Sequence, residues 1–92
     1  MDEIKKYIWH EEKRSSNLEK HSIDFEDAII IFEDPFRIER QSDRNGEERY
    51  EVIGTVYGNI LLVAYVCKES DVIRIISARR ASKNERQAYY QT

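Results

Sequence analysis

The chain has 92 residues and a formal net charge of −3, with 36% charged and 40% hydrophobic residues. A chain of this length buries only a modest core, so we expect residues 1–92 to form a single domain. The acidic balance argues against a general nucleic-acid coat protein, which is usually basic, but it is compatible with a local basic site.

Cys67 is the single cysteine of the chain. One thiol can neither close a disulfide within the chain nor build a zinc site, so the sequence fits a reducing cytosol. The amino-terminal segment lacks the long apolar region of a signal peptide. The longest apolar run, Ile60–Cys67, is too short to span a bilayer as a helix. We therefore expect a cytoplasmic protein that has no membrane partner.

The amino-terminal part of the chain predicts a short strand followed by a polar helix. The strand is expected over Ile4–Trp9 and the helix over Glu11–His21, where good helix formers occupy most positions. One face of this helix is polar, with members three or four residues apart: Lys13, Asn17, Lys20 and His21. This face is either solvated or turned toward a ligand.

A second helix is expected over Phe25–Glu33. Asp24 is suited to cap its amino terminus, and Pro35 ends it. Its apolar face should pack on a sheet and consists of Phe25, Ala28, Ile29 and Phe32.

The second half of the chain reads as strands joined by tight turns. Four strands are expected, over Phe36–Gln41, Glu48–Tyr57, Ile60–Cys67 and Val72–Arg80. Asn45-Gly46 and Gly58-Asn59 predict two of the turns, so consecutive strands should pair as an antiparallel meander. Ser82 and Glu85 form a capping-box pattern that starts the last helix at about Lys83.

The predicted fold class is therefore α+β. It is an antiparallel β-sheet, made of a meander of four strands plus the short N-terminal strand. Two N-terminal helices lie on one face of this sheet, and a C-terminal helix lies at its edge or across one end.

Arginines flank and interrupt the apolar run Val72–Ile76, and burying an unpaired guanidinium group is costly. Arg74, Arg79 and Arg80 must either pair with carboxylates or turn outward to receive an anion such as phosphate. Strand alternation separates Arg74 and Arg80 from Arg79. The three can share one site only if the strand ends or bulges near Ala78.

An ordered set of residues along nearly the whole chain resembles the BrnT toxin family. The set comprises Trp9, Lys13, Asn17, Lys20-His21, Phe25-Glu26, Ala28, Phe32, Asp34-Pro35, Glu48-Arg49, Gly54, Gly58, Ile76-Ser77-Ala78-Arg79, Glu85-Arg86 and Tyr89. The resemblance implies a RelE-like ribonuclease fold and a type II toxin. It also implies a small BrnA-type antitoxin that neutralises the toxin and binds operator DNA together with it. Two departures from the family pattern are His10, where Asp is usual, and Ser22, where Gly is usual.

Metal-independent RNA cleavage requires a base for the 2′-OH, cations for the phosphate and an acid for the 5′-oxygen, with no cofactor. The candidate catalytic residues are Lys20, His21, Glu48, Arg49 and Arg79. The candidate substrate-binding residues are Arg74, Ser77 and Arg80. His21 or Glu48 could act as base or acid, and histidine is favoured by its ordinary pKa near neutrality. Capping of the first helix is an equally good explanation of His21.

Three functional hypotheses follow. The protein is an endoribonuclease toxin held inactive by an antitoxin. Alternatively, it is a catalytically weak binding module of the same fold, which acts mainly in an antitoxin complex that represses its own operon. The third hypothesis is a small structural or dimerising domain whose arginines are only paired. Convergence of Lys20, His21, Arg49 and Arg79 on one open concavity would favour the enzyme.

Overall fold

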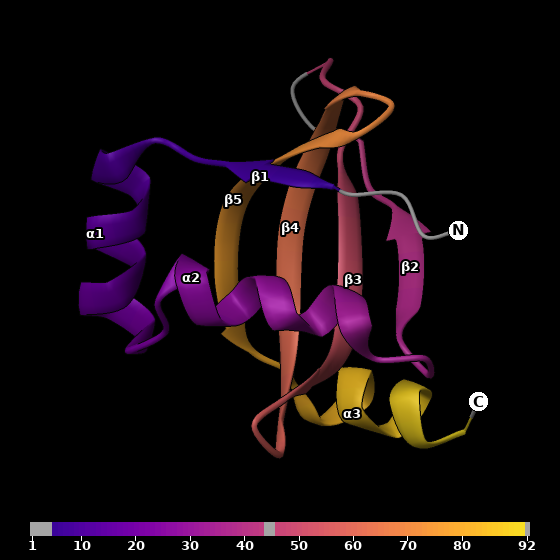
Figure 1. Ribbon diagram of the computed structural model, residues 1–92. Helices are drawn as coiled ribbons and strands as arrows, with labels where there is room; N and C mark the ends of the chain where they lie inside the picture. Colours follow the sequence, from indigo (N-terminus) through magenta and orange to yellow (C-terminus); the bar gives the residue numbers. More distant parts are fainter. Residues whose placement is uncertain (1–4, 44–45, 92) are drawn as a thin grey trace.

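The computed structural model describes residues 5–43 and 46–91, in which five strands form one sheet (Figure 1). Ile4 of the first expected strand and Asn45 of the first expected turn lie outside the described residues. In chain order, the elements are β1 Lys6–Ile8, α1 Glu11–His21, α2 Phe25–Ala28, the 3₁₀ helix η1 Ile29–Glu33, β2 Ile38–Gln41, β3 Tyr50–Val56, β4 Asn59–Glu69, β5 Val72–Arg80 and α3 Lys83–Tyr90.

The sheet has the strand order β1-β5-β4-β3-β2. The expected meander is confirmed, because β2, β3, β4 and β5 pair antiparallel in succession. The sheet as a whole is mixed rather than antiparallel, because β1 pairs parallel to β5. The two strands are separated by α1, α2, η1 and three strands, so no hairpin imposes an antiparallel pairing on them.

The second helix begins as an α-turn and continues as a 3₁₀ helix. The β-branched residues that follow Ala28 disfavour a regular α-helix. A 3₁₀ helix repeats every three residues, and the side chains buried against the sheet follow that spacing: Phe25, Ala28 and Ile31. Ile29 and Phe32 of the expected stripe also pack against this core but are only partly buried, whereas Ile31, which the expected stripe left out, is fully buried.

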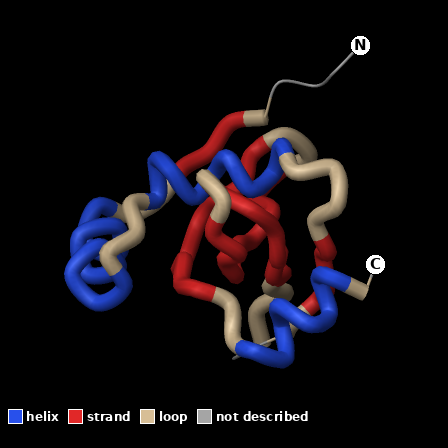
Figure 2. Tube along the Cα trace, turned by 90° about the horizontal axis from the view of Figure 1, so that it is seen from below, coloured by secondary structure: helices blue, strands red, loops and turns tan. Residues whose placement is uncertain are grey.

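Helical segments lie on both sides of the sheet (Figure 2). On one face, α2 and η1 pack over Val52, Val63 and Ala78, which lie opposite one another on β3, β4 and β5. On the other face, α3 covers one end, where Tyr89 packs against a small cluster that includes Ile53 and Leu62. The remainder of this second face, which we call the open face, carries the candidate site.

Helix α1 stands beside the edge of the sheet, next to β5 (Figure 1). It does not lie on a face of the sheet, where two N-terminal helices were expected. Strand β1 pairs only with Val72–Arg74, so the backbone of Ala78 is left for another partner. The buried Asn17 amide takes that place: its Nδ2 donates to Ala78 O at 2.8 Å and its Oδ1 accepts from Ala78 N at 3.0 Å. Asn17 is thus a structural residue that attaches α1 to β5.

Two tight bends use residues with positive φ. The β3–β4 turn consists of Tyr57 (φ 50°) and Gly58 (φ 83°), one residue earlier than the expected Gly58-Asn59 turn. Positive φ at both central residues is the type I′ geometry that suits a two-residue hairpin. Ser22 (φ 58°) ends α1 in the left-handed conformation that glycine adopts more easily.

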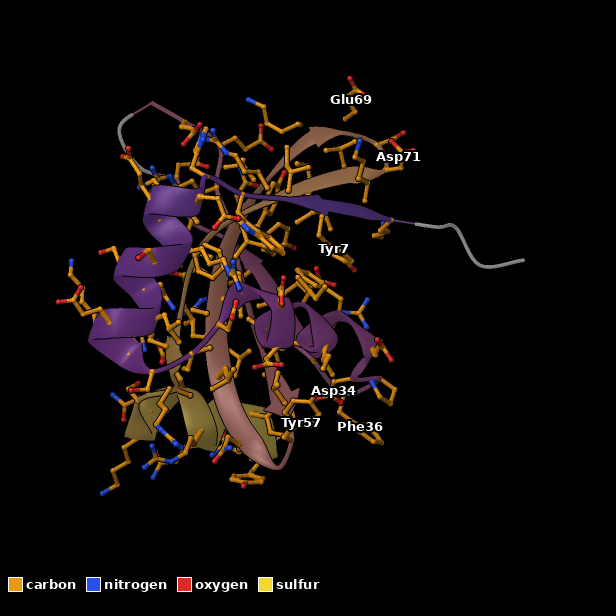
Figure 3. The ribbon with its side chains drawn as sticks, turned by 60° about the vertical axis from the view of Figure 1, so that its left-hand side comes forward. Tyr7, Asp34, Phe36, Tyr57, Glu69 and Asp71 are labelled. Carbon is orange, nitrogen blue, oxygen red and sulfur yellow. The ribbon has the colours of Figure 1, made fainter. Side chains whose placement is uncertain are left out.

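Asp34 joins three elements at the end of η1 (Figure 3). This buried carboxylate accepts hydrogen bonds from Thr55 N at 2.9 Å in β3, from Tyr89 Oη at 2.6 Å in α3 and from Phe36 N at 2.9 Å. Burial opposes its ionisation, but the hydrogen bonds from Tyr89, Phe36 and Thr55 outweigh burial and lower the pKa of Asp34.

None of the helices in residues 5–43 and 46–91 has the length and apolar character that a membrane-spanning helix needs.

Candidate functional site

A β-bulge in β5 decides which arginines share a face. Tyr65 pairs with Ile75 and Ala64 pairs with Ser77, so Ile76 is an extra residue on β5. An extra residue reverses the alternation beyond it. Arg74, which lies opposite Val66, therefore points to the same face as Ser77 and Arg79. The sequence analysis required a bulge or a strand end near Ala78, and the bulge lies two residues earlier, at Ile76.

The open face contains a cavity of about 170 Å³. Its floor is a row of residues that lie opposite one another on three strands: Glu51 on β3, Ala64 on β4 and Ser77 on β5. Arg49 and Arg79 also line it. The cavity thus brings two expected catalytic arginines and one expected substrate-binding serine together with a carboxylate.

Arg79 is paired within the molecule. Its Nη1 and Nη2 donate to the two carboxylate oxygens of Glu85 at 2.8 and 2.9 Å. These hydrogen bonds raise the pKa of Arg79 and lower the pKa of Glu85 to about 2. Arg40 Nη2 is 3.7 Å from Glu85, and Arg40 Nε is 2.9 Å from Glu51. Two carboxylates therefore hold two guanidinium groups at the end of the cavity nearest α3.

A second group of charges lies at the other end of the cavity. Glu47 accepts a hydrogen bond from Arg49 Nε at 3.0 Å and another from Arg74 Nη2 at 3.3 Å. Arg74 Nη1 is also 3.3 Å from His10 Nε2. Arg74, expected to bind substrate, is thus in contact with the same carboxylate as Arg49.

A groove of about 400 Å³ between α1 and β5 adjoins the cavity, because Ile76 and Ser77 line both. Lys13, Lys20 and His21 line the groove from α1. Within the described ranges, none of these three side chains forms a hydrogen bond or an ion pair. The two ammonium groups and the imidazole therefore remain available to an anion.

The structure does not bring Glu48 or Arg80 to this cavity. Glu48 accepts a hydrogen bond from the Tyr50 hydroxyl and lines a separate depression near the β2–β3 connection. Arg80 lies opposite Leu61 on the face that α2 and η1 cover, and it donates to Asn59 Oδ1 at 3.0 Å.

Three carboxylates at or beside the cavity, Glu47, Glu51 and Glu85, were missed by the sequence reasoning about the site. Glu51 has the same strand alternation as Arg49, and this spacing of two could have indicated a shared face. From the sequence, Glu85 was expected to serve the helix cap and a local ion pair. It does form the capping box with Ser82, but its carboxylate binds Arg79 as well. No local pattern signals that second contact.

In the part of the chain that the structure describes, no three His, Cys, Asp or Glu side chains are grouped closely enough to hold a metal ion. The arrangement consists of guanidinium and ammonium groups, carboxylates, hydroxyls and two imidazoles around a cavity and a groove. Groups of this kind can bind a phosphodiester and move protons.

Comparison with known proteins identifies the family. The model of the ribonuclease toxin BrnT of type II toxin–antitoxin systems matches residues 9–85. The crystal structure of the Brucella abortus ribonuclease toxin BrnT is similar with a TM-score of 0.67 and 31% sequence identity, and the match covers 86% of this chain and 99% of that chain. No curated protein sequence matches this chain. The chain belongs to the BrnT family of ribonuclease toxins of type II toxin–antitoxin systems.

Proposed function

We propose that the protein is a metal-independent endoribonuclease. A base removes the proton of an RNA 2′-OH, and the 2′-oxygen attacks the adjacent phosphorus. The bond from phosphorus to the 5′-oxygen breaks, and an acid donates a proton to that oxygen. The products are a 2′,3′-cyclic phosphate and a 5′-hydroxyl end. Cations around the phosphate stabilise the negative charge that builds up during the attack.

Arg49 and Arg79 are the proposed phosphate ligands because both line the cavity. Ser77 is placed between them and the groove, where its hydroxyl can hydrogen-bond the substrate. His21 is the proposed acid or base on the groove side, with Lys20 beside it as a further cation. Glu51 is the proposed partner in proton transfer, in place of Glu48, because it lines the cavity.

The observation that carries the proposal is the junction of the cavity with the groove at Ser77. One continuous concavity therefore contains Arg49 just before β3, Arg79 on β5, and Lys20 and His21 on α1. The scissile phosphate would compete with Glu85 for Arg79. Because the Arg79–Glu85 ion pair must then break, the phosphate–Arg79 contact contributes less to the affinity for RNA.

That same ion pair favours a second candidate function. If Arg79 stays with Glu85, the protein is a catalytically weak module that acts mainly in an antitoxin complex repressing its own operon. For either function, we propose that the partner is a BrnA-type antitoxin and that operator DNA is bound through the complex. Copurification with the cognate antitoxin and a shift of operator DNA by the complex alone would be the expected results.

Incubation of purified, antitoxin-free protein with RNA in EDTA separates the two functions. The endoribonuclease is expected to cut RNA and to leave cyclic phosphate ends, which mass spectrometry detects. Intact RNA at stoichiometric protein would contradict the enzyme and support the binding module.

Substitution of Arg79 tests the site in cells. Arg79→Ala should abolish growth arrest on expression without unfolding the protein. Arg37→Ala is the matched control, since Arg37 pairs with Glu39 at 3.1 Å outside the cavity and should retain toxicity. Unchanged toxicity of Arg79→Ala would remove this residue from the site.

A further inference from the structure

The carboxylate of Glu47 lies between two arginines that belong to different parts of the chain. Arg49 precedes β3 and Arg74 is in β5, and each donates to a different oxygen of Glu47. All three side chains are partly buried, with 39% of Glu47, 27% of Arg49 and 23% of Arg74 exposed. Two guanidinium groups and one carboxylate leave a surplus of one positive charge.

The cluster also contains an unsatisfied donor. Arg74 Nε is buried and has no hydrogen-bond partner. A buried donor without an acceptor is unfavourable, particularly on a charged group. A planar carboxylate offers its acceptors in one plane, whereas the oxygens of a phosphodiester are arranged tetrahedrally. An anion of that shape can supply an additional acceptor to a guanidinium fork.

The cluster lies beside the proposed cleavage site, because Arg49 contacts Glu47 and also lines the cavity. Arg74 and Arg79 lie opposite Val66 and Leu62, which are four residues apart on β4, or roughly 13 Å at a rise of ~3.3 Å per residue. Their guanidinium groups are held by different carboxylates, Glu47 and Glu85. An RNA strand that places one phosphate near Arg79 and continues along β5 would bring another phosphate to Arg74.

We propose that Arg74 forms a second phosphate subsite for the RNA strand, next to Arg49 of the cleavage site, and that the carboxylate of Glu47 occupies this subsite in the free protein. The proposal rests on the proposed ribonuclease function and names a position that its substrate fills. Glu47 is then a competitor built into the site, and RNA must displace it. Removing its charge strengthens RNA binding, and removing Arg74 cancels that gain.

The binding of a short single-stranded RNA with all 2′-OH groups methylated tests the subsite, because such a strand cannot undergo 2′-OH attack. Fluorescence anisotropy measures its Kd for the full chain. Glu47→Gln is expected to bind about two- to fivefold more tightly than wild type, the range for loss of a partly exposed ion pair. Glu33→Gln changes the net charge equally on the other face, where Glu33 is exposed, and is expected to leave Kd nearly unchanged.

Salt dependence provides the second readout. Each phosphate contact on a single strand contributes about 0.7 to the slope of log K against log salt concentration. Arg74→Gln is expected to reduce the slope by about that amount. In Glu47→Gln/Arg74→Gln the gain from Glu47→Gln should vanish, since both substitutions act on the same contact. Circular dichroism establishes that each variant is folded.

The outcomes separate the subsite from the ribonuclease function. Equal Kd values for Glu47→Gln and Glu33→Gln, or a gain that persists when Arg74 is replaced, overturn the subsite. Cleavage of unmodified RNA by the wild type would then leave the ribonuclease function intact. A wild-type protein that neither binds the methylated strand nor cuts unmodified RNA overturns both proposals.

Discussion

The two faces of the sheet are built in opposite ways. On the face that α2 and η1 cover, Phe25, Ala28 and Ile31 are fully buried against strand residues. On the open face, Glu51 and Ser77 line a cavity, and the charged groups around it contact one another rather than the core. Stability should therefore depend mainly on the covered face, and RNA binding on the open face. Matched substitutions on the two faces can test this division.

The largest effect on stability is expected from Ile31→Ala. Ile31 is fully buried on the covered face, and truncation of such a side chain costs about 2–5 kcal/mol through lost burial and the cavity left behind. Ile76→Ala is the same substitution at a half-buried position of the open face, where about 1 kcal/mol is expected. Urea unfolding of both variants measures the difference, and equal losses would contradict the division.

Asp34→Asn removes the carboxylate at the junction of η1, β3 and α3. An amide has one acceptor oxygen, so at least one donor from Thr55, Tyr89 or Phe36 loses its partner, at about 1–3 kcal/mol. Because the folded pKa of Asp34 is lowered, its charged form stabilises the protein above the unfolded pKa. That contribution is lost as the pH falls through the folded pKa.

Unfolding curves measured between neutral pH and pH 3 test this dependence. Wild type should lose stability relative to Asp34→Asn as the pH falls. Asp27→Asn serves as the control, because Asp27 is exposed and its replacement should leave the pH profile nearly unchanged.

Glu85→Gln is expected to have a smaller effect, about 1 kcal/mol, because it weakens a partly exposed ion pair while glutamine still satisfies the capping box. The pKa of Glu85 is lowered to about 2 in the folded state. Its stabilising effect is therefore complete above the ordinary glutamate pKa and is lost as the pH falls toward 2. Thermal melts between pH 5 and 2 should show a shallower decline for the variant. An identical decline would mean that the Arg79–Glu85 pair contributes nothing.

The smallest change in stability is expected from Lys20→Gln. Lys20 is exposed, so the free energy of unfolding should change by less than about 0.5 kcal/mol. Its loss from the groove should nevertheless reduce the salt slope of RNA binding by about 0.7. Lys68→Gln, an exposed lysine of β4 outside the cavity and groove, is the control. Equal salt slopes for Lys20→Gln and Lys68→Gln would show that Lys20 does not contact an RNA phosphate.

Local features of the fold were predictable because the residues that decide them are neighbours in the chain. The capping box of Ser82 and Glu85 places the start of α3 correctly, and Asp24 caps α2 as expected. The three antiparallel pairings of the meander follow from short connections. The parallel pairing of β1 with β5 joins segments more than sixty residues apart, and no turn residue encodes it.

The candidate site was predictable in its residue types but not in its geometry. Arg49, Ser77 and Arg79 line one cavity. Arg74 points to the same face because of a bulge at Ile76, inside an apolar run that gives no sign of it. Asn17 was expected on a polar face that is solvated or turned toward a ligand, but its amide binds the distant backbone of Ala78 instead. The register between strands that are distant in the chain therefore decides which side chains share a face, and the composition of a single strand does not show this.

The attachment of α1 has a consequence for motion. Leu18 is the single apolar side chain of this helix and is 44% exposed, so polar contacts hold α1 in place: the Asn17 bonds to β5 and the Arg14 ion pair with Asp24 at 2.8 Å. A segment with few apolar contacts opens at a lower free energy than the rest of a domain. Helix α1, which forms one wall of the groove, can therefore detach from β5 and rebind while the sheet stays folded. Its amide protons should exchange with deuterium well before those of β4.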